Sequence, residues 1–343
     1  MKKLLALLLF VCTYSSLLAY DDATYVDTTK FIEIDIALPP SPLLNSNIEL
    51  NGKLTLPNTI GKVTCVILVQ GSGPSDYDET ISVNKPFRDI AYGLSSNGIA
   101  VLRYDKRTYD KRILTDTSID LKNITVNEES VFDAVNAANF AFSNYADKID
   151  NVYILGHSLG GYVMPRIAKL ANNATGFILL AGNARPMEAL IKEQLQYMYE
   201  NFGNTNSWET RQKLNTELER CDKITSRNYT ADTPSDSLPL NVPAKYWLDL
   251  VDYHPADEFA DETRPILFIQ GGRDYQVTKT DLEIWRDKLT HNKQGGDNAT
   301  FVLFEDLNHL MQSGSGIPSP ADYGEKKNVD VRVINEIIKF IRK

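Results

Sequence analysis

Short, uninterrupted runs of apolar residues recur along this chain and constrain its fold more than any other feature. They cover residues 63–69, 99–103, 152–155, 177–180, 266–269 and 301–304. Runs of this kind are typical of strands buried on both faces of a mostly parallel sheet. Between them, apolar residues recur at helical spacing over 85–96, 127–142 and 329–341. The alternation predicts an α/β fold, with helices flanking a mostly parallel central sheet.

The N-terminal part of this core has a different pattern. Residues 31–36 and 48–56 alternate apolar and polar side chains. Strict alternation is typical of strands with one buried face, so we expect an antiparallel pair here.

A long segment without a buried strand interrupts the alternation. Within it, residues 187–201 and 208–221 have the spacing of amphipathic helices, and 228–239 is a polar stretch expected to form a loop. We interpret residues 183–264 as a helical cap inserted into the fold. The expected core consists of residues 21–182 and 265–343.

The first twenty residues have the composition of a targeting segment. Lys2 and Lys3 precede an unbroken apolar run over 4–11, and small residues such as Ala19 follow. This order predicts a secretory signal peptide over 1–20, and the run is too short for a stable membrane span. We therefore expect a secreted or periplasmic protein. A buried N-terminal helix or a retained anchor is the alternative.

Other sequence features bear on the exported chain. Cys65 lies inside an apolar run and is expected in the core, although a bridge to Cys221 stays open. In a eukaryotic secretory pathway, glycans could attach at Asn123, Asn173, Asn228 and Asn298.

Charge and motif content exclude several classes of function. The formal net charge is −9, and no run of basic residues offsets it, so nucleic acid is not an expected partner. The four histidines and the cysteines have no metal-ligand spacing, and no phosphate-binding loop is present. We expect neither a metal nor a cofactor. The oligomeric state is left open.

The strongest chemical signal is the Gly-His-Ser-Leu-Gly sequence at residues 156–160. It follows the apolar run 152–155 and precedes a helix-like stretch over 162–170. Between a strand and a helix, Gly-x-Ser-x-Gly predicts a nucleophile elbow, because the tight turn leaves no room for flanking side chains. Ser158 is therefore the candidate nucleophile.

A serine hydroxyl needs a base to take its proton. In chains with such an elbow, the acid and then the histidine follow the nucleophile. His309 comes shortly after the last apolar run, at the end of the sheet where the base is needed. His157 lies inside the elbow, and we expect His254 and His291 to be solvated.

Asp274 is the candidate acid. It follows the buried run 266–269, at the same edge of the sheet as Ser158. There it would hold the imidazole in its productive tautomer. The competing loop after 177–180 contains no acid, and the acids of the insert are expected to be solvated: Asp249, Asp252, Asp257 and Asp261.

Two backbone N–H groups are expected to stabilise the oxyanion of the tetrahedral intermediate. One belongs to Leu159, directly after the nucleophile. The other comes from the loop after the run 63–69, which begins Gln-Gly-Ser-Gly-Pro at residue 70. We assign this donor to Ser72, with Gly71 as the alternative.

With these assignments in place, the chain resembles the α/β-hydrolase superfamily, and in particular its EstD-type serine carboxylesterase branch. Serine-aminopeptidase-like hydrolases are relatives of that branch. The resemblance covers the chain from about residue 48 to the C-terminus, and its motifs lie at 70–80, 84–87, 101–108, 156–160, 270–277, 307–310 and 320–323. Gln70 is a departure, because these enzymes usually have histidine at this position, which shapes the oxyanion loop.

The resemblance implies an α/β-hydrolase fold and hydrolysis of small carboxylic esters, best with short acyl chains. It implies Ser158, Asp274 and His309 as the catalytic triad, in agreement with the order of motifs. A peptidase or amidase with the same triad is an alternative, in which Asp249 or Asp252 could bind a substrate amine. A non-catalytic binding protein is a further alternative, although such proteins typically lose a triad member.

Overall fold

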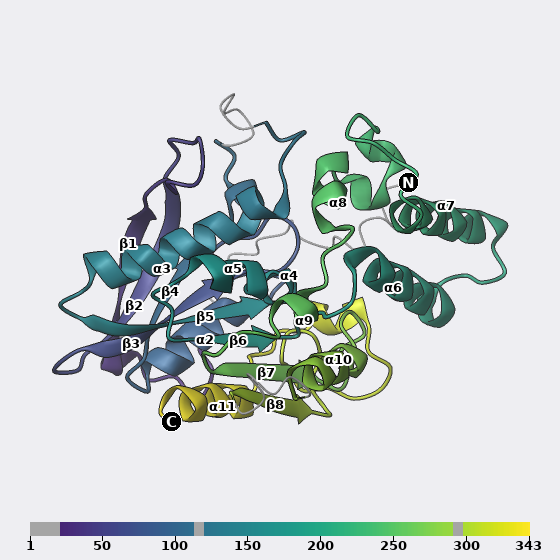
Figure 1. Cartoon of the computed structure of the whole chain (residues 1–343). Coiled ribbons are helices and arrows are strands. Elements are labelled where there is room, and N and C mark those ends of the chain that lie inside the picture. The colour runs from purple at the N-terminus through teal and green to yellow at the C-terminus, as the bar shows by residue number, and fades with distance from the viewer. Residues whose placement is uncertain (1–20, 113–119, 291–297) are drawn as a thin grey trace.

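The structure is a computed structural model that describes residues 21–112, 120–290 and 298–343 (Figure 1). The predicted signal peptide and His291 lie outside the described residues. One eight-stranded sheet has the order β1-β2-β4-β3-β5-β6-β7-β8. Its strands are β1 (Phe31–Leu38), β2 (Leu50–Pro57), β3 (Val63–Val69), β4 (Ala100–Tyr104), β5 (Ile149–His157), β6 (Gly176–Leu180), β7 (Ile266–Gly271) and β8 (Ala299–Phe304).

The sheet has an antiparallel edge and a parallel body. β1 pairs antiparallel with β2, and β2 pairs antiparallel with β4. All pairs from β4 through β3, β5, β6 and β7 to β8 are parallel. The predicted antiparallel pair and the predicted parallel runs are thus confirmed. Because these strands are parallel, their C-terminal ends lie along the same border of the sheet. The loops that follow β3, β5, β7 and β8 meet there.

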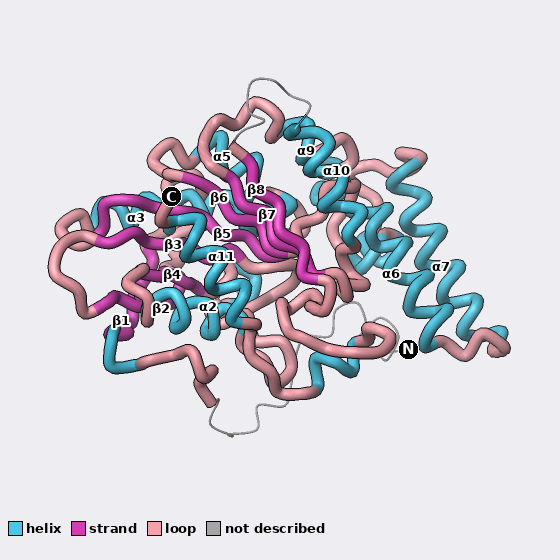
Figure 2. The backbone as a smooth tube through the Cα atoms, turned by 90° about the horizontal axis from the view of Figure 1, so that it is seen from below, coloured by secondary structure: helices cyan, strands magenta, loops and turns pink. Residues whose placement is uncertain are grey.

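Helices cover both faces of the sheet, as the uninterrupted apolar strands require. On β3, Cys65, Ile67 and Val69 face one core and Val66 and Leu68 the other, as the two-residue period of a strand dictates. The first core packs against α3 (Phe132–Asn144), α5 (Met164–Leu170) and α10 (Lys279–Thr290). The second packs against α2 (Pro86–Ser95) and α11 (Val331–Ile341), the side from which Figure 2 is seen.

Two expected helices differ in detail. The segment expected to be one helix over 127–142 begins with a π-helical turn, Asn127–Val131, before α3. After the elbow, the helix-like stretch is divided into α4 (Leu159–Tyr162) and α5, with Pro165 at the start of α5. Proline has no N–H to continue a preceding helix, so the break falls here.

The insert forms a helical layer beside the sheet, at the right in Figure 1. Its long helices are α6 (Met187–Phe202) and α7 (Trp208–Thr225), close to the predicted ranges. Two further helices were not expected from the sequence: α8 (Ala244–Leu250) and the short α9 (Pro255–Glu258). The cap has its own apolar core around Trp247, while Met187, Tyr246 and Leu250 pack against the main core.

The cysteines and the candidate glycan sites can now be placed. Cys65 and Cys221 are both free and buried, in the main core and the cap core respectively. A bridge between them is therefore not formed. Asn123 and Asn228 are exposed. The side-chain amide of Asn298 instead donates to the carbonyls of Glu262 at 2.8 Å and Arg264 at 2.7 Å.

Candidate active site

Ser158 lies on a sharp turn between β5 and α4. Its φ of 52° and ψ of −116° are strained for a residue with a Cβ. A Cβ added to Gly156 would lie 2.3 Å from the carbonyl atoms of Gly160, and one added to Gly160 would lie 2.3 Å from the carbonyl oxygen of Val69. Both glycines are therefore needed for this close approach. The turn has the geometry of a nucleophile elbow.

The candidate base and acid meet at the same edge of the sheet. His309 follows β8, and Asp274 follows β7. The Nδ1 of His309 lies 2.7 Å from Oδ2 of Asp274, and both residues are 4% exposed. Because an ionised carboxylate can only accept, Nδ1 carries the proton in this bond. The Nε2 of His309 is then left to act as a base.

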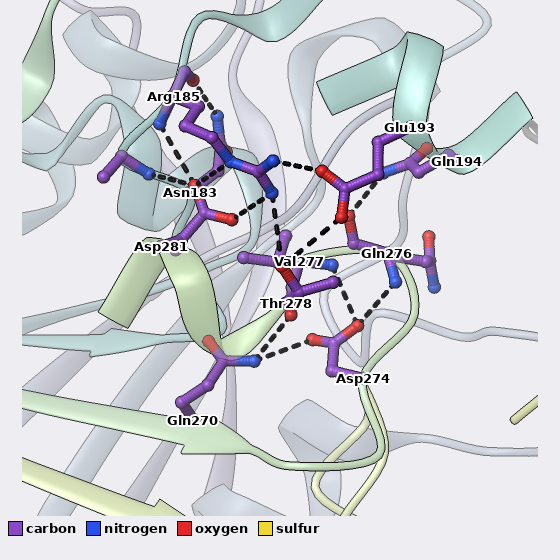
Figure 3. Close-up of polar contacts among 12 residues, drawn as sticks. Asn183, Arg185, Glu193, Gln194, Gln270, Asp274, Gln276, Val277, Thr278 and Asp281 are labelled. Carbon is purple, nitrogen blue, oxygen red and sulfur yellow. Dashed lines mark hydrogen bonds and ion pairs between the residues drawn. The ribbon is translucent and has the colours of Figure 1, made fainter. Parts of the chain in front are cut away.

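The carboxylate of Asp274 is held by a dense set of donors (Figure 3). Its Oδ1 accepts from the backbone N–H groups of Gln276 at 2.8 Å and Val277 at 2.9 Å. Its Oδ2 also accepts from Nε2 of Gln270 at 3.2 Å. The same Nε2 donates to the carbonyl of Val277 at 2.7 Å. Gln270, a buried amide at the end of β7, is a positioning residue that the sequence analysis did not identify.

The candidate oxyanion loop, which begins at Gln70, lies against Ser158. A Cβ added to Gly71 would come within 3.1 Å of the Cβ of Ser158. The N–H of Gly71 donates to Oε1 of Glu79 at 2.6 Å, which directs it away from an oxyanion. Ser72 therefore remains our candidate donor from this loop. Leu159 is the first residue of α4, where an N–H has no acceptor within its own helix.

Gln70 precedes this loop and is buried. Its side-chain amide donates to the carbonyl of Tyr104 at the end of β4. The residue that departs from the usual histidine thus joins the start of the loop to the neighbouring strand.

These features can be compared with known proteins. A family model described as "Alpha/beta hydrolase family" matches residues 66–317. The chain belongs to the alpha/beta hydrolase family. It is 40% identical over 324 residues to Esterase EstD of Thermotoga maritima, an alignment that covers 94% of this chain and 71% of that protein.

Solved structures share the fold of this hydrolase at low sequence identity. The Pyrococcus furiosus esterase Pf2001 matches with a TM-score of 0.52 and 13% identity, over 91% of this chain and 92% of that one. The Pyrococcus horikoshii acylaminoacyl peptidase matches with a TM-score of 0.54 and 14% identity, over 92% of this chain and 41% of that one. The α/β-hydrolase fold predicted from the sequence is confirmed.

A buried pair that was not expected from the sequence lies behind the candidate residues Ser158, Asp274 and His309. His157 and Glu79 are both almost fully buried, and Nδ1 of His157 lies 2.9 Å from Oε1 of Glu79. The Nε2 of His157 lies 2.9 Å from the carbonyl oxygen of His309 and must donate to it. Glu79 thus connects the candidate oxyanion loop, through Gly71, to His157 and so to the backbone of His309.

The charge state of His157 follows from these contacts. Burial opposes its protonated form, but the charge and hydrogen bond of Glu79, with the His309 carbonyl, outweigh burial and raise the pKa of His157. A protonated ring can donate from both nitrogens, which satisfies both contacts. In sequence, His157 was only the variable residue of the elbow, and Glu79 lay within the motif at 70–80 without a spacing that would assign it a partner.

The cap of the hydrolase is tied to the acid loop (Figure 3). Arg185, just before α6, donates to Oδ2 of the buried Asp281 on α10 at 2.7 Å and also pairs with Glu193 of α6. The side-chain amide of Gln194 on α6 donates to the carbonyl of Gln276 at 2.8 Å. A movement of α6 would therefore be transmitted to the loop that holds the candidate acid.

The other sequence candidates lie outside this cluster. Asp249 pairs with Arg166 at 2.6 Å, and Asp252 pairs with Arg227. His254 is exposed. Within the described residues, no group of three or more His, Cys, Asp and Glu could hold a metal ion. None of the described helices combines the length and hydrophobicity that a membrane crossing requires.

The buried pair predicts a pH dependence of stability. The pKa of His157 is raised by folding, so its stabilisation is complete below the ordinary value of 6.5 and is lost as pH rises through the folded value. Relative to Glu79→Gln, wild type should lose free energy of unfolding with a slope of up to about 1.4 kcal/mol per pH unit. Urea unfolding between about pH 6 and 9 measures this difference. If the free energy of unfolding had the same pH dependence in wild type and Glu79→Gln, Glu79 would not be what keeps His157 protonated.

Proposed function

We propose that this hydrolase is a carboxylesterase that acts through an acyl-enzyme intermediate. The observation that carries the proposal is the 2.7 Å contact between His309 and Asp274, at the sheet edge that also presents Ser158 on its strained turn. The 40% identity to Esterase EstD supports ester hydrolysis as the reaction.

The chemistry follows from the roles that these residues can take. His309 removes the proton of Ser158, whose Oγ forms a bond to the ester carbonyl carbon. The N–H groups of Leu159 and Ser72 stabilise the oxyanion. The C–O bond to the alcohol breaks, and the alcohol leaves with the proton from His309. Water, activated by the same histidine, then hydrolyses the acyl-enzyme and releases the acid.

The surroundings of the triad suggest what the substrate contacts. Tyr275 and Leu310, next to the acid and the base, form an apolar cluster with Tyr323 and with Tyr197 of α6. The rings of Tyr197 and Tyr275 are stacked with centroids 5.2 Å apart. This apolar cluster beside the acid and the base favours an uncharged ester as the substrate class.

The peptidase alternative is less well supported. It requires a free carboxylate to bind the substrate amine, and both candidates for that role are paired with arginines. The 14% identity to an acylaminoacyl peptidase indicates a shared fold. It carries no argument about the substrate of this chain.

The proposed activity can be tested with p-nitrophenyl esters from acetate to palmitate. We expect wild type to hydrolyse the short esters fastest, and Ser158→Ala to lose at least about a thousandfold in kcat because it lacks the nucleophile. Ser226→Ala, which changes an exposed hydroxyl on the cap, is the control and should match wild type. Equal rates for wild type and Ser158→Ala, or a wild type inert on every ester, would rule out the proposed mechanism.

We also propose that the enzyme is secreted or periplasmic. The proposal is supported by the charged start, short apolar run and small residues of positions 1–20. N-terminal sequencing of the protein from the extracellular or periplasmic fraction should give a chain that starts near Asp21. Recovery of the uncleaved chain from the cytoplasm would contradict export.

A further inference from the structure

The carbonyl of Gly71 and the N–H of Ser72 belong to one planar peptide unit. If the N–H points at the oxyanion, the carbonyl oxygen points in the opposite direction, into the protein. What binds that oxygen therefore controls both the orientation and the polarity of the donor.

The group that binds it is a buried ammonium. Lys106, two residues beyond β4, is 1% exposed, and its Nζ donates to the carbonyl oxygen of Gly71 at 2.7 Å. Its backbone N–H is itself held by the carbonyl of Ser75 at 2.9 Å. Lys106 is thus joined to this loop by two hydrogen bonds, one from its side chain and one from its backbone.

The ammonium has little else to compensate its burial. Its ion-pair partner is Glu129, whose Oε1 lies 3.6 Å away, beyond hydrogen-bond distance. Glu129 is also engaged by the hydroxyls of Thr108 at 3.2 Å and Tyr246 at 2.8 Å. Removing an ammonium from water is costly unless it is paired and hydrogen-bonded. The hydrogen bond to Gly71 is the shorter of these two interactions of the ammonium.

Charged side chains of opposite sign contact Gly71 of the oxyanion loop at its N–H and at its carbonyl oxygen. Glu79 accepts the N–H of Gly71 at 2.6 Å, while Lys106 donates to the carbonyl of the same residue. Hydrogen bonds to charged groups are stronger than neutral ones, and a cation on a carbonyl oxygen polarises the peptide and strengthens its N–H as a donor. The effect falls on the N–H of Ser72.

We propose that Lys106 is a positioning residue of the oxyanion hole, which orients and polarises the Gly71–Ser72 peptide through the carbonyl oxygen of Gly71. This inference rests on the proposed function and on Ser72 as the donor. Its benefit appears in the transition state, when negative charge develops on the substrate oxygen.

The test compares wild type with Lys106→Met, which keeps the length of the side chain and removes its charge. Loss of a direct oxyanion donor costs about 10²–10³-fold in kcat. Since Lys106 acts through the peptide, we expect kcat to fall about 10–100-fold, with KM within about threefold of wild type. An alkyl boronic acid, which forms a tetrahedral adduct with the serine, should bind more weakly by the same factor as kcat/KM. Lys106→Arg should recover part of the loss.

The neighbouring Arg107 provides a matched control. It is also 1% exposed, but it forms a bidentate pair with Asp133 at 2.6 and 2.9 Å rather than contacting the loop. Arg107→Met should lower the melting temperature and leave kcat per titrated active site unchanged. If Lys106→Met does not fold, Lys106→Gln makes the same comparison with a shorter neutral side chain.

The outcomes separate the two proposals. Folded Lys106→Met or Lys106→Gln with wild-type kcat and boronic-acid affinity would overturn the role of Lys106 and leave the esterase function intact. A change confined to melting temperature would overturn it as well, because the role would then be structural. A wild type that is inert on esters would instead overturn the proposed function.

Discussion

The turn at Ser158 is the constraint on which the rest of the active site depends. It exists because Gly156 and Gly160 let a strand, a helix and the end of β3 approach more closely than any side chain allows. The contact of Gly160 with Val69 requires β3 and β5 to be neighbours, as they are in the sheet. That pairing brings the loop after β3 beside Ser158. The pairing of β3 with β5 and the position of this loop thus both follow from one steric requirement.

Buried polar side chains then fix the loops that surround this turn. Gln270 and two backbone amides hold the carboxylate of Asp274, and Glu79 and Lys106 hold Gly71 from its two sides. Each of these groups loses its hydrogen bonds to water on folding. Hydrogen bonds to the loops replace them. Groups arranged in this way before the substrate binds do not have to reorganise during the reaction, which is the basis of electrostatic catalysis.

The sequence predicted the parts of the molecule that short-range patterns encode. Strand runs, helical spacing and the Gly-x-Ser-x-Gly motif located the sheet, both long cap helices and the elbow at Ser158. It could not predict the partners of Glu79, which are 8 and 78 residues away in the chain and meet it only in the folded state. Neither did it find Gln270 as a support for Asp274, because a polar residue at a strand end has no distinctive spacing. The helix α8 was missed because its seven residues are too few for helical spacing to be recognised in the sequence.

We propose that His309 and Asp274 activate Ser158 as the nucleophile. The most direct test of this proposal is labelling of wild type with a fluorophosphonate, which reacts with an activated serine, followed by mass spectrometry of the digested protein. We expect one adduct per chain, on the peptide that contains Ser158, and loss of this adduct in His309→Ala. An ester-hydrolysing enzyme that carries the adduct on another serine, or that labels equally without His309, would contradict it.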